Sequence, residues 1–319
     1  MAVQYMGSKQ RILGNILGII PDDVTSILDM CSGSGQVSRF LSRNTYKVDS
    51  NDILNFCNVL ASAYLNSTQP QVDKLESIIE PINSNKINLL EYRDHWIVEN
   101  FSRKAKFLYP DIAMKCAYLI ETINKNPDIF DIGMTCLLEA ISIRLNSMGH
   151  QTSYRSSFTS NALLPIKFEA VDVHLKDYKS DLFNRDILAN SLPTEGYDLS
   201  YVDPPYNSRR YDLYYHLYET IVLQDTSGFT HKVGYTNRHK GSVASTLNNK
   251  IYAKEALDNV IANNKSKYLL LSYADIGIVS KYDILHAMKN YGVVTGQTIP
   301  LIYMGKKQVN EYLFLLERF

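Results

Sequence analysis

Short apolar runs that stop at turn residues predict β-strands in two parts of the chain. Residues 25–30 form one such run, and residues 46–49 form a second that stops at Ser50, Asn51 and Asp52. Residues 198–202 and 267–272 have the same character, and the latter is apolar enough for a buried strand. Because a glycine-rich turn and a helical pattern follow the first run, we expect a strand–turn–helix unit there.

The apolar pattern changes to a helical period in the middle of the chain. From about Ile53 to Tyr178, apolar residues recur three and four positions apart, without strand–turn–helix alternation. The sequence therefore predicts a mostly helical insertion, with Gly149 as the C-cap of its clearest helix. The apolar positions of that helix are Met134, Leu137, Leu138, Ile141, Leu145 and Met148.

Strand signals resume after this insertion and continue to the last residues. Residues 293–303 and 311–316 are β-prone, and Gly305, Lys306 and Lys307 between them predict a terminal hairpin. Strands on both sides of the insertion, with helical patterns between them, indicate an α/β architecture. We expect a parallel sheet that is interrupted by a helical insertion.

Composition narrows the class of protein. Hydrophobic residues make up 45% of the chain, enough for a packed core. No run of about 18 uninterrupted apolar residues occurs, and the first residues lack a signal-peptide pattern, so we expect a cytoplasmic protein without a membrane span. The cysteines stand singly at Cys31, Cys57, Cys116 and Cys136, which favours reduced core residues over disulfides or a metal site.

Net charge does not indicate a nucleic-acid partner. Lysine plus arginine and aspartate plus glutamate number 33 each, so such a partner would need a local basic face. Residues 103–106, Arg209 with Arg210, and residues 238–240 are the candidates. Each could equally be a solvated surface cluster.

The turn after the first strand has the composition of a ligand-binding loop. Gly33 and Gly35 allow the backbone to come close to a ligand. A dinucleotide-binding loop has a third glycine where this chain has Ser38, which disfavours an NAD-dependent oxidoreductase. A packing turn without a ligand is the other interpretation.

Acidic residues follow the first two strands. Asp52 could accept hydrogen bonds from both ribose hydroxyls of a nucleoside cofactor, and we prefer it to Asp49 because ligands bind where strands end. Asp29 could hold an ammonium group or order the glycine loop.

The strongest chemical signal is Asp203-Pro204-Pro205-Tyr206, which directly follows the run at 198–202. Two consecutive prolines hold the backbone extended. Hydrogen bonds from an exocyclic aromatic amine to Asp203 and to the Pro204 carbonyl would expose the lone pair of the nitrogen for attack on a methyl sulfonium. Tyr206 offers a flat face for a base removed from a duplex. A structural turn with a core tyrosine is the alternative.

These motifs resemble those of the Dam-like family of adenine-N6 DNA methyltransferases. Residues 203–206 match its catalytic motif, residues 28–35 resemble its glycine motif, and Asn51 with Asp52 resembles its second motif. Residues 5–9, followed by Arg11 and Leu13, resemble its N-terminal cofactor motif, and the motif order is kept. Many members have Phe or Pro where this chain has Met30 and Cys31.

The resemblance implies a Rossmann-like S-adenosylmethionine methyltransferase sheet with a mostly helical inserted target-recognition domain. Residues 1–52 and 179–319 would form the catalytic domain, and residues 53–178 the insertion. The implied activity is site-specific methylation of N6 of adenine in double-stranded DNA, by base flipping and direct transfer. Residues 211–219 and 271–273 resemble a restriction-modification branch, so a cognate restriction endonuclease is an expected partner.

The cofactor contacts that we expect come from the glycine loop and from the resemblance. Asp186 would bind the adenine amine of S-adenosyl-L-methionine. The full set is Tyr5, Lys9, Asp29, Cys31, Ser32, Gly33, Ser34, Gly35, Asp52 and Asp186.

Two polar loops are candidates for DNA contact, although either could be a plain surface loop. Residues 144–158 carry many potential partners for base edges, and residues 234–241 combine glycines with cations. A basic pair also follows Tyr206 closely enough to contact a phosphate beside a flipped base. The expected DNA contacts are Gln151, Arg155, Arg209, Arg210, Arg238 and Lys240.

Two rival functions remain at this point. The same scaffold could methylate RNA or the N4 amine of cytosine, although cytosine-N4 enzymes more often have serine in place of Asp203. A nucleotide-binding or DNA-binding module without catalysis would not need the complete acid-Pro-Pro-aromatic motif.

Overall fold

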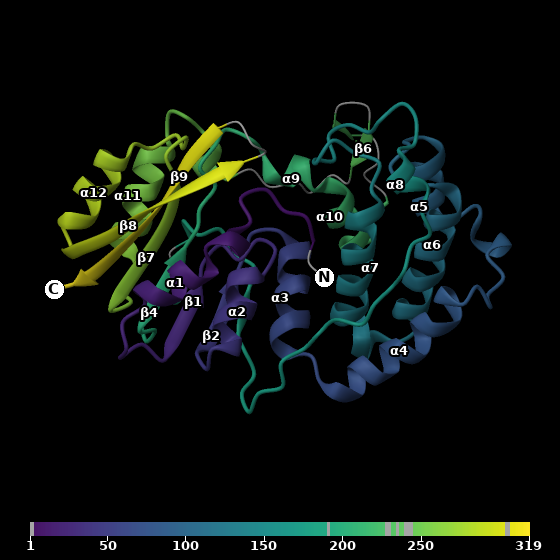
Figure 1. Cartoon of the computed structure of the whole chain (residues 1–319), viewed down its shortest axis with the longest axis horizontal. Coiled ribbons are helices and arrows are strands. Elements are labelled where there is room, and N and C mark those ends of the chain that lie inside the picture. The colour runs from purple at the N-terminus through teal and green to yellow at the C-terminus, as the bar shows by residue number, and fades with distance from the viewer. Residues whose placement is uncertain (1–2, 190–191, 227–230, 234–235, 239–244, 304–306) are drawn as a thin grey trace. The chain divides into compact units, whose positions relative to one another are not determined.

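The chain folds into two compact units, each built from three separate stretches (Figure 1). This computed structural model describes residues 3–189, 192–226, 231–233, 236–238, 245–303 and 307–319. The helical unit comprises Met1–Met6, Leu54–Asp177 and Tyr211–Val243. The sheet unit comprises Gly7–Ile53, Tyr178–Arg210 and Ala244–Phe319.

A seven-stranded sheet with the order β3-β2-β1-β4-β7-β9-β8 forms the centre of the sheet unit. The first five strands in this order run parallel, whereas β9 is antiparallel to both β7 and β8. The strands are β1 Ser26–Asp29, β2 Lys47–Asn51, β3 Leu182–Phe183, β4 Leu199–Val202, β7 Tyr268–Ala274, β8 Gly292–Tyr303 and β9 Lys307–Arg318.

The expected Rossmann-like α/β fold is confirmed. The hairpin predicted from the last β-prone segments is formed by β8 and β9, and Gly305 and Lys306 of its turn lie outside the described residues. This hairpin adds two strands without a crossover connection, so the sheet is parallel over its first five strands and mixed as a whole.

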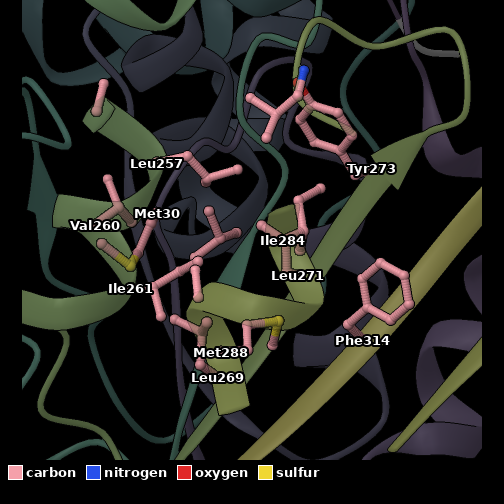
Figure 2. Close-up of a cluster of buried hydrophobic side chains, with 14 of the residues drawn as sticks. Met30, Leu257, Val260, Ile261, Leu269, Leu271, Tyr273, Ile284, Met288 and Phe314 are labelled. Atoms are coloured by element: carbon pink, nitrogen blue, oxygen red, sulfur yellow. The ribbon is translucent and has the colours of Figure 1, made fainter. Parts of the chain in front are cut away.

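Alternating side chains along the strands build one core on each face of the sheet. Ile27 and Leu270 belong to the cluster that includes α1 (Leu13–Ile19) and α2 (Gln36–Arg43). Leu28, Leu269 and Leu271 belong to the opposite cluster, with α11 (Ala253–Asn263) and α12 (Lys281–Lys289). Figure 2 shows how Leu257, Ile261, Ile284 and Met288 of these two helices meet the strands. Burial on both faces makes this sheet a rigid support for the loops at its edge.

The helical unit packs around α7 (Phe130–Arg144), which is buried along most of its length. Its other α-helices are α3 Asn55–Asn66, α4 Gln69–Asn83, α5 Trp96–Val98, α6 Pro110–Asn124, α8 Ser160–Leu163, α9 Tyr211–Tyr214 and α10 His216–Leu223. Short helical turns lie at Leu90–Tyr92, Glu99–Arg103 and Pro127–Ile129. A separate pair of antiparallel strands is formed by β5 His231–Val233 and β6 Thr236–Arg238. The sheet unit adds two 3-10 turns, η1 Lys9–Arg11 and η5 Thr246–Asn248.

The prediction of α7 was right in position but wrong at its end. The helix stops at Arg144, and Leu145 is already extended, so Gly149 does not cap it. The physical reason is Asn146, whose side-chain amide donates to the carbonyls of Lys106 and Arg155 at 2.9 and 3.2 Å. These bonds draw the chain away from the helix axis, and a local apolar pattern does not reveal them.

The segment after Asp203-Pro204-Pro205-Tyr206 contributes to the helical unit. Glu219 of α10 accepts hydrogen bonds from the backbone N–H groups of Asn55 and Phe56, at 3.1 and 3.0 Å. These N–H groups open α3 and would otherwise lack partners. The compact unit therefore extends beyond the segment 53–178 that the apolar pattern marked as the insertion.

None of the described helices is both long and apolar enough to cross a bilayer. No group of three or more histidine, cysteine or acidic side chains in the described ranges is placed to hold a metal ion. Cys31, Cys57, Cys116 and Cys136 are free thiols.

Candidate active site

Two aspartates mark the point where the strand order of the sheet reverses. Asp29 ends β1, and Asp203 directly follows β4, the strand next to it. From this point β2 and β3 lie to one side, and β7 lies to the other. Open α/β sheets bind ligands at the carboxyl ends of strands at such a switch point. The topology therefore brings the predicted glycine loop and catalytic motif to one edge of the sheet.

The glycine loop is ordered by two carboxylates. Gly33 and Gly35 have φ values of +51° and +71°, in the left-handed region that favours glycine. The Gly33 N–H donates to Oδ2 of Asp52 at 2.8 Å, and the Ser38 hydroxyl donates to Oδ2 of Asp29 at 2.5 Å. Ser38, which weakened the dinucleotide interpretation, thus has a defined role in anchoring the loop.

Buried polar atoms of this loop remain available for further bonds. Oδ1 of Asp29 and Oγ of Ser32 have no hydrogen-bond partner within the described part of the chain. Burial, together with the nearby charges of Asp203 and Asp52, raises the pKa of Asp29 to about 7. An unpartnered buried acceptor is costly, so a ligand that donates to it would be favoured.

The predicted carboxylates gather around Cys31. Burial first, and then the charges of Asp52, Asp29, Asp203 and Asp186, raise the pKa of the Cys31 thiol. Asp186 lies just after β3, and its Oδ1 accepts from the Leu188 N–H at 3.0 Å. The structure therefore brings these four acidic residues to the same part of the sheet edge.

Asp203 is paired with a buried lysine. Its side chain is 18% exposed, and its Oδ1 lies 2.8 Å from Nζ of Lys9. The same ammonium lies 3.2 Å from Oε1 of Glu311 and donates to the Gly7 carbonyl at 3.1 Å. Lys9 therefore lies between two carboxylates.

The charges of this cluster act on the pKa of each member. Burial raises the pKa of Asp203 to about 6; the Lys9 ammonium lowers it, and the Glu311 carboxylate raises it. Burial alone would lower the pKa of Lys9, but the charges of Asp203 and Glu311 raise it above its usual value. Lys9 is therefore charged throughout the physiological range, and Asp203 is ionised above about pH 6.

Tyr206 is held by four neighbours, three at its ring and one at its backbone. Gly7 has a φ of +80°, and a Cβ atom there would lie 3.0 Å from the Tyr206 hydroxyl oxygen. Lys9 Nζ lies 5.4 Å from the centroid of the Tyr206 ring, and Tyr273 packs edge-on at 6.0 Å. The Tyr206 carbonyl accepts from the Ile278 N–H at 2.8 Å. A side chain larger than glycine at position 7 would disturb this ring.

Glu311 is a member of the site that the sequence patterns did not identify. It lies on β9, is 3% exposed, and accepts from the Ser272 hydroxyl of β7 at 2.8 Å. The only signal was an acid at the start of an apolar, β-prone segment. Its partners lie on other strands and on η1, so no local pattern could assign it.

Tyr5 belongs to the helical unit, unlike the other residues of the expected cofactor set. Its ring stacks on Tyr215 with centroids 4.7 Å apart, and Tyr211 and Phe56 lie within 6.4 Å. The Tyr215 hydroxyl also accepts from the Met6 N–H at 2.6 Å. This segment is thus anchored in an aromatic cluster.

The predicted DNA contacts differ in their exposure. Gln151 is buried, and its Oε1 accepts from the N–H groups of Leu217 and Tyr218 at 2.7 and 3.4 Å, so it caps α10. Arg155 and Arg209 are exposed, and Arg210 is half-buried. Arg238 lies in β6, and Lys240 lies outside the described residues, as do Gly234 and Gly241 at the ends of its loop.

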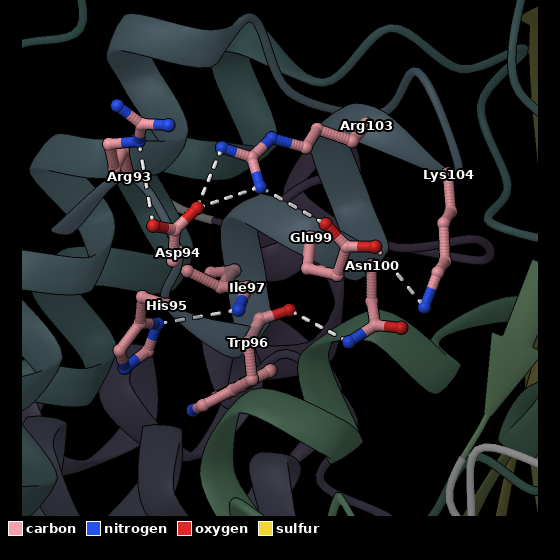
Figure 3. A network of polar contacts seen from close by, with 9 residues as sticks. All are labelled: Arg93, Asp94, His95, Trp96, Ile97, Glu99, Asn100, Arg103 and Lys104. Atoms are coloured by element: carbon pink, nitrogen blue, oxygen red, sulfur yellow. Dashed lines mark hydrogen bonds and ion pairs between the residues drawn. The ribbon is translucent and has the colours of Figure 1, made fainter.

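Arg103 and Lys104 of the basic run at residues 103–106 are paired with neighbouring acids, as Figure 3 shows. Arg103 pairs with Asp94 at 3.1 Å and with Glu99 at 3.2 Å. Lys104 lies 3.3 Å from the second oxygen of Glu99. This cluster is therefore a network of surface ion pairs, and it presents less positive charge than its sequence suggests.

The fold and the site together are those of a Rossmann-like methyltransferase. Residues 5–284 match the D12 class N6 adenine-specific DNA methyltransferase family, and the chain belongs to this family. The resemblance inferred from the motifs is thereby confirmed.

Curated relatives of the chain are named as type II methyltransferases and modification methylases. It is 27% identical over 345 residues to the type II methyltransferase M.FokI of Planomicrobium okeanokoites, which covers 99% of this chain and 53% of that protein. It is 26% identical over 348 residues to the modification methylase StsI of Streptococcus sanguinis, which covers 99% of this chain and 52% of that protein. The chain thus spans about half the length of these two relatives.

A third relative is matched along most of its length. The type II methyltransferase M.CviAII of Paramecium bursaria Chlorella virus 1 is 24% identical over 305 residues, which cover 91% of this chain and 89% of that protein.

Proposed function

We propose that this chain is a site-specific DNA methyltransferase that transfers a methyl group from S-adenosyl-L-methionine to the N6 amine of adenine in double-stranded DNA. The observation that carries the proposal is the position of Asp203. This carboxylate follows β4 at the switch point of the sheet, beside the glycine loop, and is paired with Lys9. Membership of the D12 class family and the names of the relatives support it.

The residues at the glycine loop fit a nucleoside cofactor. Buried Oδ1 of Asp29 and Oγ of Ser32 lack a partner in the described ranges, and Gly33 and Gly35 leave the backbone open to close approach. When bound, S-adenosyl-L-methionine supplies a methyl group on a positively charged sulfur. The residues that would hold it are Lys9, Asp29, Cys31, Ser32, Gly33, Ser34, Gly35, Asp52 and Asp186, and the resemblance adds Tyr5 to this set.

Asp52 is the better candidate for the ribose hydroxyls. The competing Asp49 already accepts from the Tyr197 hydroxyl at 2.6 Å and from the Asp181 N–H at 2.7 Å. Asp52 uses Oδ2 for Gly33 and lies directly beyond the end of β2. Its position therefore supports the ribose role, and the bonds of Asp49 support a structural one.

Asp203 and the Pro204 carbonyl would act on the amine. The adenine amine is a weak nucleophile because its lone pair is delocalised into the ring. Two acceptors that take its N–H bonds would move the nitrogen toward tetrahedral geometry and expose that lone pair. Asp203 can accept only when ionised, and Lys9 favours the ionised form. Tyr206 would stack on the flipped base.

The test is methylation by the purified protein with S-adenosyl-L-methionine and duplex DNA, followed by mass spectrometry of the nucleosides. We expect N6-methyladenine, and kcat about 10²–10³-fold lower in Asp203→Ala because that substitution removes an interaction made in the transition state. Asp22→Ala removes an exposed acid and serves as the control. N4-methylcytosine, or a product found only in RNA, would replace the proposed substrate.

A cognate restriction endonuclease is the proposed partner, because the relatives include type II methyltransferases and modification methylases. DNA from cells that produce the chain should resist one endonuclease specificity. Equal digestion of DNA from producing and non-producing cells by enzymes of all tested specificities would contradict this part of the proposal.

A further inference from the structure

Three acceptors lie within 3.2 Å of the Lys9 ammonium nitrogen. They are the Gly7 carbonyl at 3.1 Å, Oδ1 of Asp203 at 2.8 Å and Oε1 of Glu311 at 3.2 Å. Lys9 itself is only 5% exposed. Three acceptors around a buried ammonium define its position closely, so the place of Lys9 depends on Glu311 as well as on Asp203.

Glu311 is held in place from the sheet. It pairs with Ala274 in the β7–β9 register, and the Ser272 hydroxyl two residues earlier on β7 donates to its Oε1 at 2.8 Å. A buried carboxylate is stable only when it is paired and hydrogen-bonded, and here Ser272 and Lys9 provide both. Because two central strands set its backbone, Glu311 is a rigid support for Lys9.

Asp203 can accept a hydrogen bond in addition to its ion pair. Its Oδ1 lies 2.8 Å from Nζ of Lys9, yet this buried atom has no hydrogen-bond partner within the described part of the chain. The groups that influence the charge of Asp203 are Lys9 on η1, Glu311 on β9, Asp29 at the end of β1, Tyr201 on β4, and the nearby Tyr206 and Cys31. Lys9 is the only cation in this group, and it is shared with Glu311.

We propose that Glu311 is a positioning residue for catalysis, which together with Ser272 holds the Lys9 ammonium beside Asp203 and so keeps that carboxylate in place to accept from the target amine. This inference rests on the methyl transfer proposed above. Glu311 and Ser272 do not touch the reacting atoms; they act through Lys9.

The first test is the pH dependence of kcat/KM, because a purely structural role would not move it. Glu311→Gln keeps the size and the hydrogen-bond acceptor but removes a negative charge near Asp203, so the acid limb should move to lower pH. Lys9→Gln removes the positive charge, so the acid limb should move to higher pH. Glu317→Gln makes the same change at an exposed position of the same strand and should leave the limb in place.

The second test is the value of kcat above pH 8, where Asp203 is ionised in every variant. Glu311→Ala removes the support of Lys9 and should lower kcat about 10–100-fold, whereas Glu311→Gln should recover most of the activity. Ser272→Ala keeps the Glu311 carboxylate, so its kcat should lie between the kcat of wild type and that of Glu311→Ala. Circular dichroism and S-adenosyl-L-methionine affinity verify that each variant is folded. If Glu311→Ala does not fold, Ser272→Ala takes its place as the variant that weakens the support of Lys9.

A readout without turnover separates this inference from the proposed function. The ¹³C carboxyl signal of Asp203, assigned by its loss in Asp203→Asn, should titrate at lower pH in Glu311→Gln and at higher pH in Lys9→Gln. If the titration and the acid limb of Glu311→Gln match those of wild type and Glu317→Gln, the positioning role is wrong. If wild type makes no N6-methyladenine, the proposed function is wrong, and the carboxyl titration alone then decides whether Glu311 acts on Asp203.

Discussion

Asp29 carries a carboxyl group whose charge the fold disfavours. Its side chain is fully buried at the end of β1, and burial with the charges of Asp203 and Asp52 raises its pKa to about 7. A folded-state pKa above the unfolded value means that the folded protein binds the proton more tightly. The stability from this proton is fully present below about pH 4 and is lost as the pH rises through about 7.

Asp29→Asn should therefore become more stable relative to wild type as the pH rises. The asparagine has the same shape and no charge, so the two proteins should unfold at similar temperatures near pH 4. Between the unfolded and folded pKa values, the advantage of the variant should grow by up to about 1.4 kcal/mol for each pH unit. Calorimetry at pH 4, 6 and 8 measures it. An unfolding difference that is the same at all three pH values would show that Asp29 is not the titrating group.

Asp52 should contribute directly to cofactor affinity. We expect Asp52→Ala to weaken S-adenosyl-L-methionine binding by about 1.5–3 kcal/mol, because it removes charge-assisted bonds to the ribose and the bond to the Gly33 N–H. Isothermal titration calorimetry is the measurement. Asp49→Ala is the matched control and should keep the affinity; the reverse result would transfer the ribose role to Asp49.

At the scale of elements, Gln151 connects a loop to a helix. Its Oε1 accepts from two N–H groups in the first turn of α10, and its own N–H donates to the Tyr214 carbonyl at 2.8 Å. The first N–H groups of a helix have no partner within the helix, so this side chain completes the end of α10. Its contacts support a structural role for Gln151, and Arg155 is the exposed candidate for DNA reading.

Gln151→Ala should destabilise the helical unit by about 1–3 kcal/mol, since it leaves buried N–H groups without an acceptor. Arg155→Ala removes an exposed side chain of the same loop and should change the free energy of unfolding by less than about 0.5 kcal/mol. Denaturant unfolding compares the two. If Arg155→Ala instead changes which sites are methylated, the loop reads DNA; if Gln151→Ala is as stable as wild type, the capping bonds contribute nothing measurable.

Local patterns predicted the elements of the sheet edge well, because those motifs are contiguous in sequence. The strand before Gly33 and Gly35, and the strand before Asp203, could each be identified within ten residues of their motif. Glu311 could not, because its role depends on a register with β7 and on Lys9 near the other end of the chain. The end of α7 was missed for a similar reason, since Asn146 bonds to carbonyls outside its own segment.

The membership of residues 211–223 could not be read from their apolar spacing either. They follow the catalytic motif directly, and their spacing predicts a helix but not its unit. Tertiary contacts decide the unit to which they belong. Glu219 accepts hydrogen bonds from the first turn of α3, and the ring of Tyr215 stacks on that of Tyr5. A buried acid in a helix that is otherwise apolar was the one available signal.

At the scale of the whole molecule, the proposed affinity for DNA would come from a local arrangement of cations. The net charge is zero, and Arg103 and Lys104 of the basic run at 103–106 are paired with Asp94 and Glu99. Arg209 is exposed and lies three residues after Tyr206 in the sheet unit. Arg209 is therefore an exposed cation close in sequence to the catalytic motif, and we use it to test phosphate contact.

Arg209→Ala should weaken DNA binding and reduce the slope of log affinity against log salt concentration by about one, because one phosphate contact is lost. Arg103→Ala should leave that slope unchanged, since Arg103 is already paired with acids. Fluorescence anisotropy with a labelled duplex at several salt concentrations measures both slopes. Equal slopes for Arg209→Ala and wild type would place the phosphate contacts elsewhere.

The place of β9 in the sheet has a consequence for synthesis on the ribosome. This strand follows β7 and β8 in sequence, yet it lies between them in the sheet and carries Glu311. Until residues 307–318 have emerged, β7 exposes an unpaired edge and β8 has no neighbour, which is a state prone to aggregation. Nascent chains stalled with these residues still in the exit tunnel should thus be cleaved readily by protease at the sheet unit and recruit chaperones, whereas release of the same residues should bring protection within one step. Gradual protection along the chain would show that the sheet forms before its inner strand arrives.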